Sequence, residues 1–209
     1  MPLPPFKAYL FDLDGTLLDS APDICGAVST VLSKTSRPDV PYDYLKSFIG
    51  RHLTDLFEDL FPEASADQVH AWIAEYRRVY PARGHKETLL YPGAAEAIAR
   101  LGGIKSTATT KSTQTATHIL NTFNLARHFH HIQGTDGFPS KPAPDVIHRA
   151  LEVLGVEPKD ALFIGDSVPD MIAGHAAGVN VCAVTYGYGN AEDLRAHSPH
   201  FCLNTLHEL

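Results

Sequence analysis

The sequence predicts an α/β protein with a doubly wound, mainly parallel sheet and a helical block inserted after the first strand. Two observations support this fold class. Short apolar runs alternate with amphipathic helical patterns along most of the chain, as they do in β-α-β units. Residues 20–88 interrupt this alternation, because they contain helical patterns and no convincing strand.

The predicted strands are short apolar runs of the kind that parallel sheets bury on both faces. The run Ile104–Thr109 is weaker than the others because Ser106 and Thr107 dilute it. Two further runs, His131–Gly134 and Phe201–Leu203, could form short strands at the sheet edges. The strongest strands are predicted at Ala8–Asp12, Ala161–Gly165 and Asn180–Thr185.

Helical patterns lie between these strands. Apolar side chains in Asp145–Leu154 recur at a spacing of three and four residues, which places them on one helix face. Gly178 directly follows the pattern over Asp170–Ala177 and is a typical helix stop. Two more helices of this part are predicted at Pro92–Leu101 and Thr113–Phe123.

The inserted block is predicted to hold helices separated by prolines, with Pro81–Tyr91 as the segment that returns to the sheet. Its clearest pattern lies over Asp67–Tyr80, where apolar residues keep the helical spacing. Its other helices are predicted at Ile24–Leu32, Tyr42–Phe48 and Leu53–Phe61. We therefore expect residues 1–18 and 88–209 to form an α/β core domain, and residues 19–87 a helical domain.

Composition narrows the class of protein. The 209 residues are 44% hydrophobic and 20% charged, which indicates a globular chain with a sizeable core. A net charge of −7 disfavours binding to nucleic acid or to an anionic membrane. No apolar stretch approaches the roughly 18 residues that span a membrane, and residues 1–5 lack the features of a signal peptide.

The three cysteines stand far apart in the sequence and form no metal-binding spacing. They are Cys25, Cys182 and Cys202, and Cys182 lies in an apolar run that we expect in the core. An odd number of cysteines without a disulfide pattern is typical of a reducing compartment, so we expect a cytoplasmic protein.

Two acids follow the first predicted strand. Asp12 and Asp14 stand two residues apart at its carboxyl end, where open α/β sheets place their ligands. Carboxylates this close repel each other, and they persist where a cation neutralises them or a proton is shared. Their hard oxygen atoms suit Mg2+. The alternative is a strand followed by an ordinary Asp-Gly turn.

A second pair of acids follows another strand. Asp166 comes directly after the run Ala161–Gly165, and Asp170 lies four residues further on. One of these acids could ligate a metal while the other supports it. Alternatively, Asp170 could cap the helix that begins there.

Other polar residues stand at comparable positions. Lys141, before a predicted helix, could steady a phosphate or the acids, and it could equally be a solvated surface lysine. Thr109 and Thr110, after the weak strand, could donate to phosphate oxygens or form a simple turn. Because all these residues follow strands of one sheet, we expect a cation site beside a phosphate site.

The order of these motifs resembles the haloacid dehalogenase superfamily of phosphohydrolases, over essentially the whole chain. Within it the chain is most similar to phosphoglycolate phosphatases. The resemblance implies a Rossmann-like core with an inserted small α-helical cap domain. It rests on Asp12-x-Asp14-Gly15-Thr16, Thr109, Lys141-Pro142, Gly165-Asp166-Ser167-x2-Asp170 and the tail Thr185-Tyr186-Gly187-Tyr188-Gly189.

The resemblance also implies an activity. The protein would be a Mg2+-dependent phosphatase of a small phosphate ester, with 2-phosphoglycolate as the favoured substrate. Asp12 would attack phosphorus and become an aspartyl-phosphate. Asp14 would protonate the leaving oxygen and then activate the water that hydrolyses the intermediate.

The remaining roles follow from the same resemblance. Mg2+ would be held by the Asp12 carboxylate, the backbone carbonyl of Asp14 and Asp166, with Asp170 in support. Cations and hydrogen-bond donors are needed there, because a carboxylate must approach a phosphate dianion. The phosphoryl oxygens would be bound by Thr109, Thr110 and Lys141.

The chain departs from the family pattern in two places. Relatives commonly carry Thr-Asn where this chain has Thr109-Thr110, and the loop 134–139 is short for a phosphoglycolate phosphatase. Substrate specificity is expected from the helical domain, in the loop that holds Arg51 and His52. Arg51 could pair with a carboxylate of the substrate, or it could be a plain surface arginine.

Several alternatives stay open. The substrate could be a sugar phosphate, a nucleotide or pyrophosphate, and a phosphomutase would keep both acids of the first motif. Asp14 argues against dehalogenase and phosphonate hydrolase chemistry. A phosphate-accepting receiver domain and an inactive binding or regulatory relative are the non-enzymatic alternatives. We expect a monomer or a homodimer, with no nucleic-acid or membrane partner.

Overall fold

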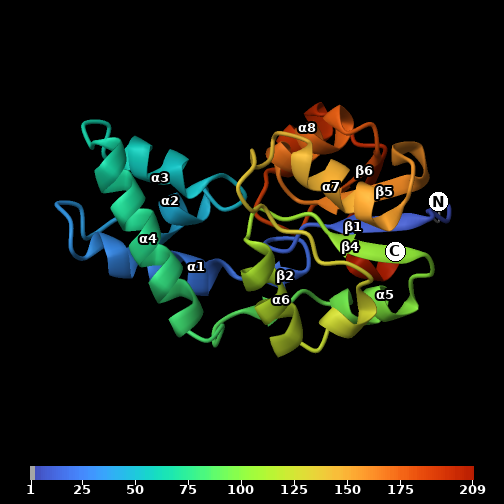
Figure 1. Ribbon diagram of the computed structural model, residues 1–209, viewed down its shortest axis with the longest axis horizontal. Coiled ribbons are helices and arrows are strands. Elements are labelled where there is room, and N and C mark those ends of the chain that lie inside the picture. Colours follow the sequence, from blue (N-terminus) through green and yellow to red (C-terminus); the bar gives the residue numbers. More distant parts are fainter. Residues whose placement is uncertain (1–2) are drawn as a thin grey trace. The chain divides into compact units, whose positions relative to one another are not determined.

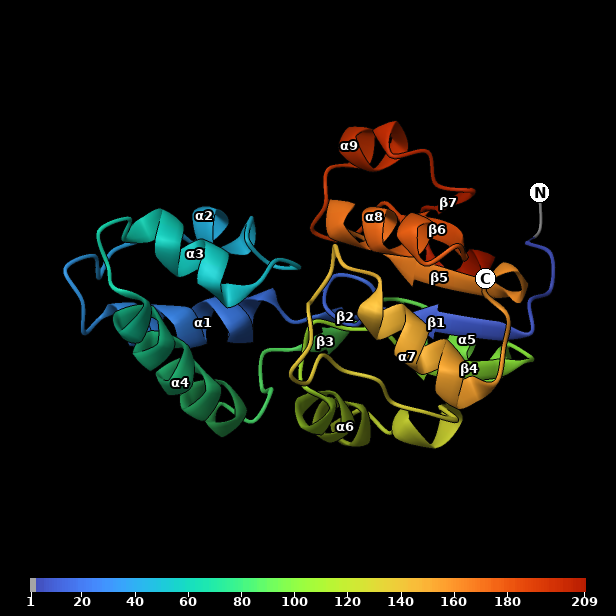
Figure 2. The same ribbon diagram turned by 45° about the horizontal axis from the view of Figure 1, so that its top comes forward.

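The computed structural model describes residues 3–209, which fall into two compact units (Figures 1 and 2). Unit 1 comprises Met1–Asp19 and Leu90–Leu209, and unit 2 comprises Ser20–Leu89. Met1 and Pro2, which belong to the segment where we expect no signal peptide, lie outside the described residues. Within residues 3–209, no helix is long and apolar enough to cross a membrane.

Unit 1 contains a five-stranded parallel sheet with the strand order β4-β1-β5-β6-β7. β1 pairs with β4 on one side and with β5 on the other, so that Phe11 lies opposite both Thr107 and Ile164. This register brings the carboxyl ends of these three strands to one edge of the sheet. The strands are β1 (Ala8–Phe11), β4 (Ile104–Thr107), β5 (Ala161–Gly165), β6 (Asn180–Val184) and β7 (Phe201–Leu203).

Helices cover both faces of this sheet, which confirms the predicted α/β class. Figure 1 shows α7 and α8 on one side of the sheet and α5 and α6 on the other. The apolar runs are continuous because side chains on both faces of the strands are buried. These helices are α5 (Ala94–Arg100), α6 (Thr113–Thr122), α7 (Asp145–Leu154) and α8 (Val168–Ala176).

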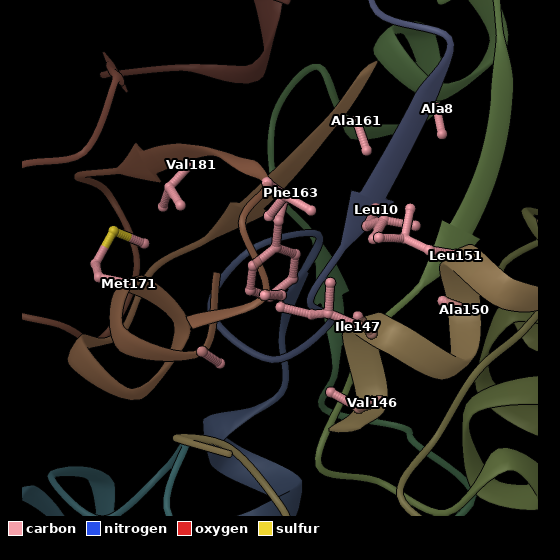
Figure 3. Close-up of a cluster of buried hydrophobic side chains, with 14 of the residues drawn as sticks. Ala8, Leu10, Val146, Ile147, Ala150, Leu151, Ala161, Phe163, Met171 and Val181 are labelled. Atoms are coloured by element: carbon pink, nitrogen blue, oxygen red, sulfur yellow. The ribbon is translucent and has the colours of Figure 1, made fainter. Parts of the chain in front are cut away.

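The core beneath α7 and α8 is a cluster of buried apolar side chains (Figure 3). Leu10 of β1 and Phe163 of β5 meet Ile147 of α7 in this cluster, and Met171 joins it from α8. Burying aliphatic and aromatic side chains like these contributes roughly 1.5–3 kcal/mol each. This packing fixes the strands whose ends carry the polar motifs. Cys182 of β6 is also buried, as predicted.

Unit 2 is helical, as predicted, with α1 and α3 packed against α4. A capping box at Ser65 and Gln68 starts α4. We predicted the end of this helix at Tyr80, which was wrong, because α4 runs through Pro81 to Ala82. Arg83 N–H still reaches Val79 O there, so the missing N–H of Pro81 does not end the last turn. The helices are α1 (Ala21–Leu32), α2 (Tyr42–Lys46), α3 (Leu53–Leu60) and α4 (Ala66–Ala82).

The prediction of an edge strand over His131–Gly134 was also wrong. Among the described residues it forms only an isolated bridge, between Ser106 and His131. The hydroxyl of Thr107 donates to Gln133 O and accepts from Gln133 N–H, at 2.9 and 2.8 Å. The Thr107 side chain thus adds to the backbone hydrogen bonds from His131 N–H to Lys105 O and from Thr109 N–H to Gln133 O.

Several short elements were not predicted. β2 (Leu18–Asp19) and β3 (Leu89–Leu90) pair as a two-stranded sheet. Helix α9 (Ala191–Ala196) is capped by Asn190, whose side chain accepts hydrogen bonds from two backbone N–H groups. Elements this short leave no periodic pattern in the sequence. The 3-10 helices are η1 (Ala126–His128), η2 (Pro158–Asp160) and η3 (Leu206–Glu208).

Candidate active site

Three carboxylates meet where β1 and β5 end. Asp12 follows β1, Asp166 follows β5, and Asp170 lies in the first turn of α8. Each offers an oxygen atom within 4.8 Å of the others, and all three side chains are buried. They meet because β1 and β5 pair in parallel, with Phe11 opposite Ile164, so that both strands end at the same edge of the sheet. The structure thus brings Asp12 of the first motif together with both acids of the last motif, whereas Asp14 is paired with Lys111.

Lys141 joins this cluster. Its Nζ lies 2.9 Å from Asp12 Oδ1 and 2.5 Å from Asp170 Oδ1, and its side chain has no exposed surface. Burial alone would lower the pKa of Lys141, but Asp12 and Asp170 raise it above its ordinary value. Lys141 is therefore a fixed positive charge inside the cluster, and not the solvated lysine of the alternative interpretation.

The negative charge of the three acids exceeds the positive charge of Lys141, and the pKa values of the acids reflect this excess. Burial raises the pKa of Asp12 to about 6, although Lys141 opposes the shift. The pKa of Asp166 lies well above its ordinary value because of burial and the neighbouring Asp170 and Asp12. A cation held by these oxygens would relieve the repulsion, and hard carboxylate oxygens in this number fit a divalent ion such as Mg2+.

Two hydrogen bonds orient Asp166. Thr16 Oγ1 donates to its Oδ1 at 2.9 Å, and the backbone N–H of Tyr188 donates to its Oδ2 at 2.8 Å. Gly15 makes this close approach possible. It adopts a φ of +81°, and a Cβ there would lie 2.1 Å from Asp166 Oδ2. The turn after β1 therefore requires glycine at this position.

Asp170 has both of the roles that the sequence left open. It forms a capping box with Ser167 at the start of α8, and Ser167 Oγ donates to Asp170 Oδ2 at 2.6 Å. Its other oxygen, Oδ1, contacts Lys141. The start of the helix thus holds Asp170 in place beside the other two acids.

Lys111 is a site residue to which the sequence analysis gave no role. Its Nζ lies 2.9 Å from Asp14 Oδ2, and only 7% and 8% of the two side chains are exposed. Lys111 comes directly after Thr109 and Thr110 on the loop that follows β4. The sequence feature that could have identified Lys111 is its place on the same loop as Thr109 and Thr110. Sequence alone does not show where such a long side chain points.

The two threonines lie on that loop, beside the end of β1. Thr109 is fully buried, and its hydroxyl accepts a hydrogen bond from the backbone N–H of Lys111 at 3.4 Å. Thr110 is partly buried. Their binding of phosphate oxygens stays a prediction.

Arg51 and His52 lie in unit 2, between α2 and α3. The guanidinium of Arg51 stands over the ring of Phe48, 5.2 Å from its centroid. His52 caps α3, where its Nδ1 accepts a hydrogen bond from Thr54 N–H at 3.3 Å. Both residues thus have local structural partners, and their role in specificity stays a prediction.

The fold and this site together define an α/β phosphohydrolase, with buried acids and lysines at the carboxyl ends of parallel strands. The chain belongs to the haloacid dehalogenase-like hydrolase family, whose family model matches residues 9–184. The resemblance seen in the sequence is thereby confirmed, and the protein is a phosphatase of this family.

Individual relatives agree with this assignment. Phosphoglycolate phosphatase 1 of Pseudomonas aeruginosa is 32% identical, over 97% of this chain and 78% of that protein. Phosphoglycolate phosphatase of Nitrosospira multiformis is 33% identical, over 91% of this chain and 88% of that protein. A solved haloacid dehalogenase-like hydrolase from Streptococcus pneumoniae superimposes with a TM-score of 0.89 at 30% identity, covering 97% and 96% of the two chains.

Proposed function

We propose that this phosphatase is Mg2+-dependent and hydrolyses 2-phosphoglycolate to glycolate and phosphate through an aspartyl-phosphate on Asp12. The observation that carries the chemistry is the buried cluster of Asp12, Asp166 and Asp170 around Lys141. Relatives named phosphoglycolate phosphatase, at 32% and 33% identity, support the choice of substrate.

In the first half of the proposed reaction, a carboxylate oxygen of Asp12 attacks phosphorus while the bond to the leaving oxygen breaks. Asp14 donates a proton to that oxygen, and glycolate departs. Lys141 holds Asp12 in place and offsets its charge. Thr109, Thr110 and Lys141 bind the phosphoryl oxygens.

In the second half, Asp14 takes a proton from water, which attacks the phosphorus of the aspartyl-phosphate and releases phosphate. When bound, Mg2+ supplies positive charge that offsets the repulsion between the phosphate dianion and the acids. The residues that would hold it are Asp12, Asp14 through its backbone carbonyl, and Asp166, with Asp170 in support.

We further propose that residues 19–87 act as a cap domain and that Arg51 and His52 contact the substrate. A dry, closed site strengthens charge interactions and protects an intermediate from side reactions. We expect the protein to work in the cytoplasm, as a monomer or a homodimer.

The deciding experiment measures phosphate release from purified protein with Mg2+. The substrates are 2-phosphoglycolate, sugar phosphates, nucleotides, pyrophosphate and an aryl phosphate. We expect kcat/KM for 2-phosphoglycolate to exceed the others by about 100-fold, equivalent to roughly 2.7 kcal/mol of transition-state discrimination. EDTA should abolish turnover and Mg2+ should restore it.

Other results would redirect the assignment. A preference for another ester would replace the substrate while keeping the chemistry. An isomerised sugar phosphate without free phosphate would indicate a mutase. Turnover that persists in EDTA would reject the metal, and failure on every substrate would point to a binding or regulatory protein.

A further inference from the structure

The two lysines of the site serve different acids. Lys141 has no exposed surface and is enclosed between Asp12 and Asp170. Lys111 is paired with Asp14 instead, and both side chains of that pair keep a small exposed edge. Lys111 is therefore the lysine on the side of the proposed acid, whereas Lys141 is on the side of the nucleophile.

This position places Lys111 close to the leaving group. In the proposed reaction Asp14 must come within hydrogen-bond distance of the leaving oxygen. Because Lys111 Nζ is 2.9 Å from Asp14 Oδ2, it then lies within about 6 Å of the leaving oxygen when Oδ2 carries the proton, and within about 8 Å when Oδ1 does. A single carbon separates the ester oxygen from the carboxylate of 2-phosphoglycolate. The carboxylate thus falls within reach of the ammonium group.

We propose that Lys111 is a specificity-determining residue that binds an anionic group of the leaving alcohol. It selects phosphate esters of 2-hydroxy acids over esters of uncharged alcohols. This inference rests on the proposed function, because it needs Asp14 to act at the leaving oxygen. It assigns recognition of the substrate carboxylate to unit 1, independently of Arg51 in unit 2.

The physical properties of a lysine fit this role. Its ammonium group is a compact charge on a flexible four-carbon stem, so it can contact Asp14 and a substrate carboxylate in turn. In surroundings as buried as these, an ion pair is screened far less than in bulk water. A neutral leaving group gains nothing from this charge, so the ammonium discriminates between the two classes of ester.

The test compares two substrates that differ in one charge, 2-phosphoglycolate and its amide, phosphoglycolamide. Lys111→Met keeps the length of the side chain and removes its charge. We expect its kcat/KM for 2-phosphoglycolate to fall about 10- to 100-fold, as for the loss of a charge-assisted hydrogen bond. The fall for phosphoglycolamide should be several-fold smaller, because it reports only the loss of the contact between Lys111 and Asp14. The difference should lie mainly in KM, and Lys111→Arg should restore part of the preference.

Lys7→Met is the matched control. Lys7 also pairs with an aspartate of unit 1, with Nζ 2.8 Å from Asp160 Oδ2, but it precedes β1 and so lies at the opposite edge of the sheet. It should leave both kcat/KM values unchanged. Circular dichroism and the melting temperature of each variant establish that it is folded.

The outcomes separate the inference from the proposed function. An equal loss on both substrates in Lys111→Met would show that Lys111 serves the phosphoryl group or Asp14, and no loss on either would show that it serves neither. Both results overturn the inference while 2-phosphoglycolate stays the substrate. If the wild-type protein hydrolyses aryl phosphate but not 2-phosphoglycolate, the proposed substrate and the inference fail together.

Discussion

Asp12 in unit 1 and Asp23 in unit 2 are both buried aspartates, but their surroundings differ. Asp23 accepts hydrogen bonds from Arg83 Nε, the backbone N–H of Glu87 and the hydroxyl of Thr88, at 2.8–3.1 Å. Burial alone would raise the pKa of Asp23, but these donors hold it below its ordinary value. Burial instead raises the pKa of Asp12 to about 6, because Lys141 opposes the shift only in part and the acids Asp170 and Asp14 add to it.

The comparison shows how the surroundings of a structural acid differ from those of the proposed nucleophile. Asp23 joins α1 to the segment that ends unit 2, and three donors satisfy its carboxylate oxygens. The cluster around Asp12 is short of positive charge, which costs stability in the absence of a cation. Substitution of Asp12 should therefore reduce activity, whereas substitution of Asp23 should reduce the stability of the fold.

The largest expected effect is the loss of turnover in Asp12→Asn. An amide cannot form the aspartyl-phosphate, so kcat/KM should fall more than about 10³-fold, or roughly 4 kcal/mol of barrier. The loss of kcat/KM is measured as phosphate release from the preferred substrate in the presence of Mg2+. Activity near that of the wild type would contradict the role of Asp12 as nucleophile.

The next effect is on stability. Asp23→Ala removes the partner of three donors, among them a partly buried arginine, so unfolding free energy should fall by about 2–4 kcal/mol. Urea unfolding measures the loss. Asp67→Ala, in the exposed first turn of α4, is the control and should change stability far less. A loss no larger than that of the control would mean that Asp23 contributes little to unit 2.

Asp12 should show the reverse effect on stability in metal-free protein. Its folded pKa is raised from 3.8 to about 6, so the folded state keeps a proton that the unfolded state has lost. Its contribution to stability is therefore present below about pH 4 and is lost as the pH rises to 6. Asp12→Asn cannot ionise, and at pH 7 it should be more stable than the wild type by up to about 3 kcal/mol.

Melting temperatures of the wild type and of Asp12→Asn in EDTA, between pH 4 and 8, test this expectation. The two curves should converge near pH 4 and separate above pH 6. Added Mg2+ should stabilise the wild type more than the variant at pH 7. A wild type that is the more stable of the two at pH 7 without metal would contradict the raised pKa.

The smallest expected effect is found by comparing substitutions in the two capping boxes, at Ser65 and at Ser167. Ser65 caps α4 in an exposed setting, so Ser65→Ala should cost about 1 kcal/mol and leave kcat/KM unchanged. Ser167 caps α8 and also donates to Asp170, so Ser167→Ala should in addition lower kcat/KM. Urea unfolding and steady-state kinetics of both variants measure these changes in stability and in kcat/KM. Equal kcat/KM values would mean that the Ser167 hydroxyl does not position Asp170 for the reaction.

Much of the fold and part of the site follow from the sequence. Apolar runs such as Ala161–Gly165 predict buried strands because only strands covered on both faces are apolar throughout. Parallel strands end at one edge of a sheet, so the sequence by itself predicts that Asp12 and Asp166 meet.

Other features were decided only by the tertiary structure. The pairing of Lys111 with Asp14 depends on the direction that the loop after β4 gives to a long, flexible side chain. The run His131–Gly134, which could have formed a strand, makes only an isolated bridge beside β4, where the Thr107 hydroxyl contacts both backbone groups of Gln133. Periodicity and motif order are local properties that a sequence carries, whereas the partner of a charged side chain is set by distances that exist only after the chain has folded.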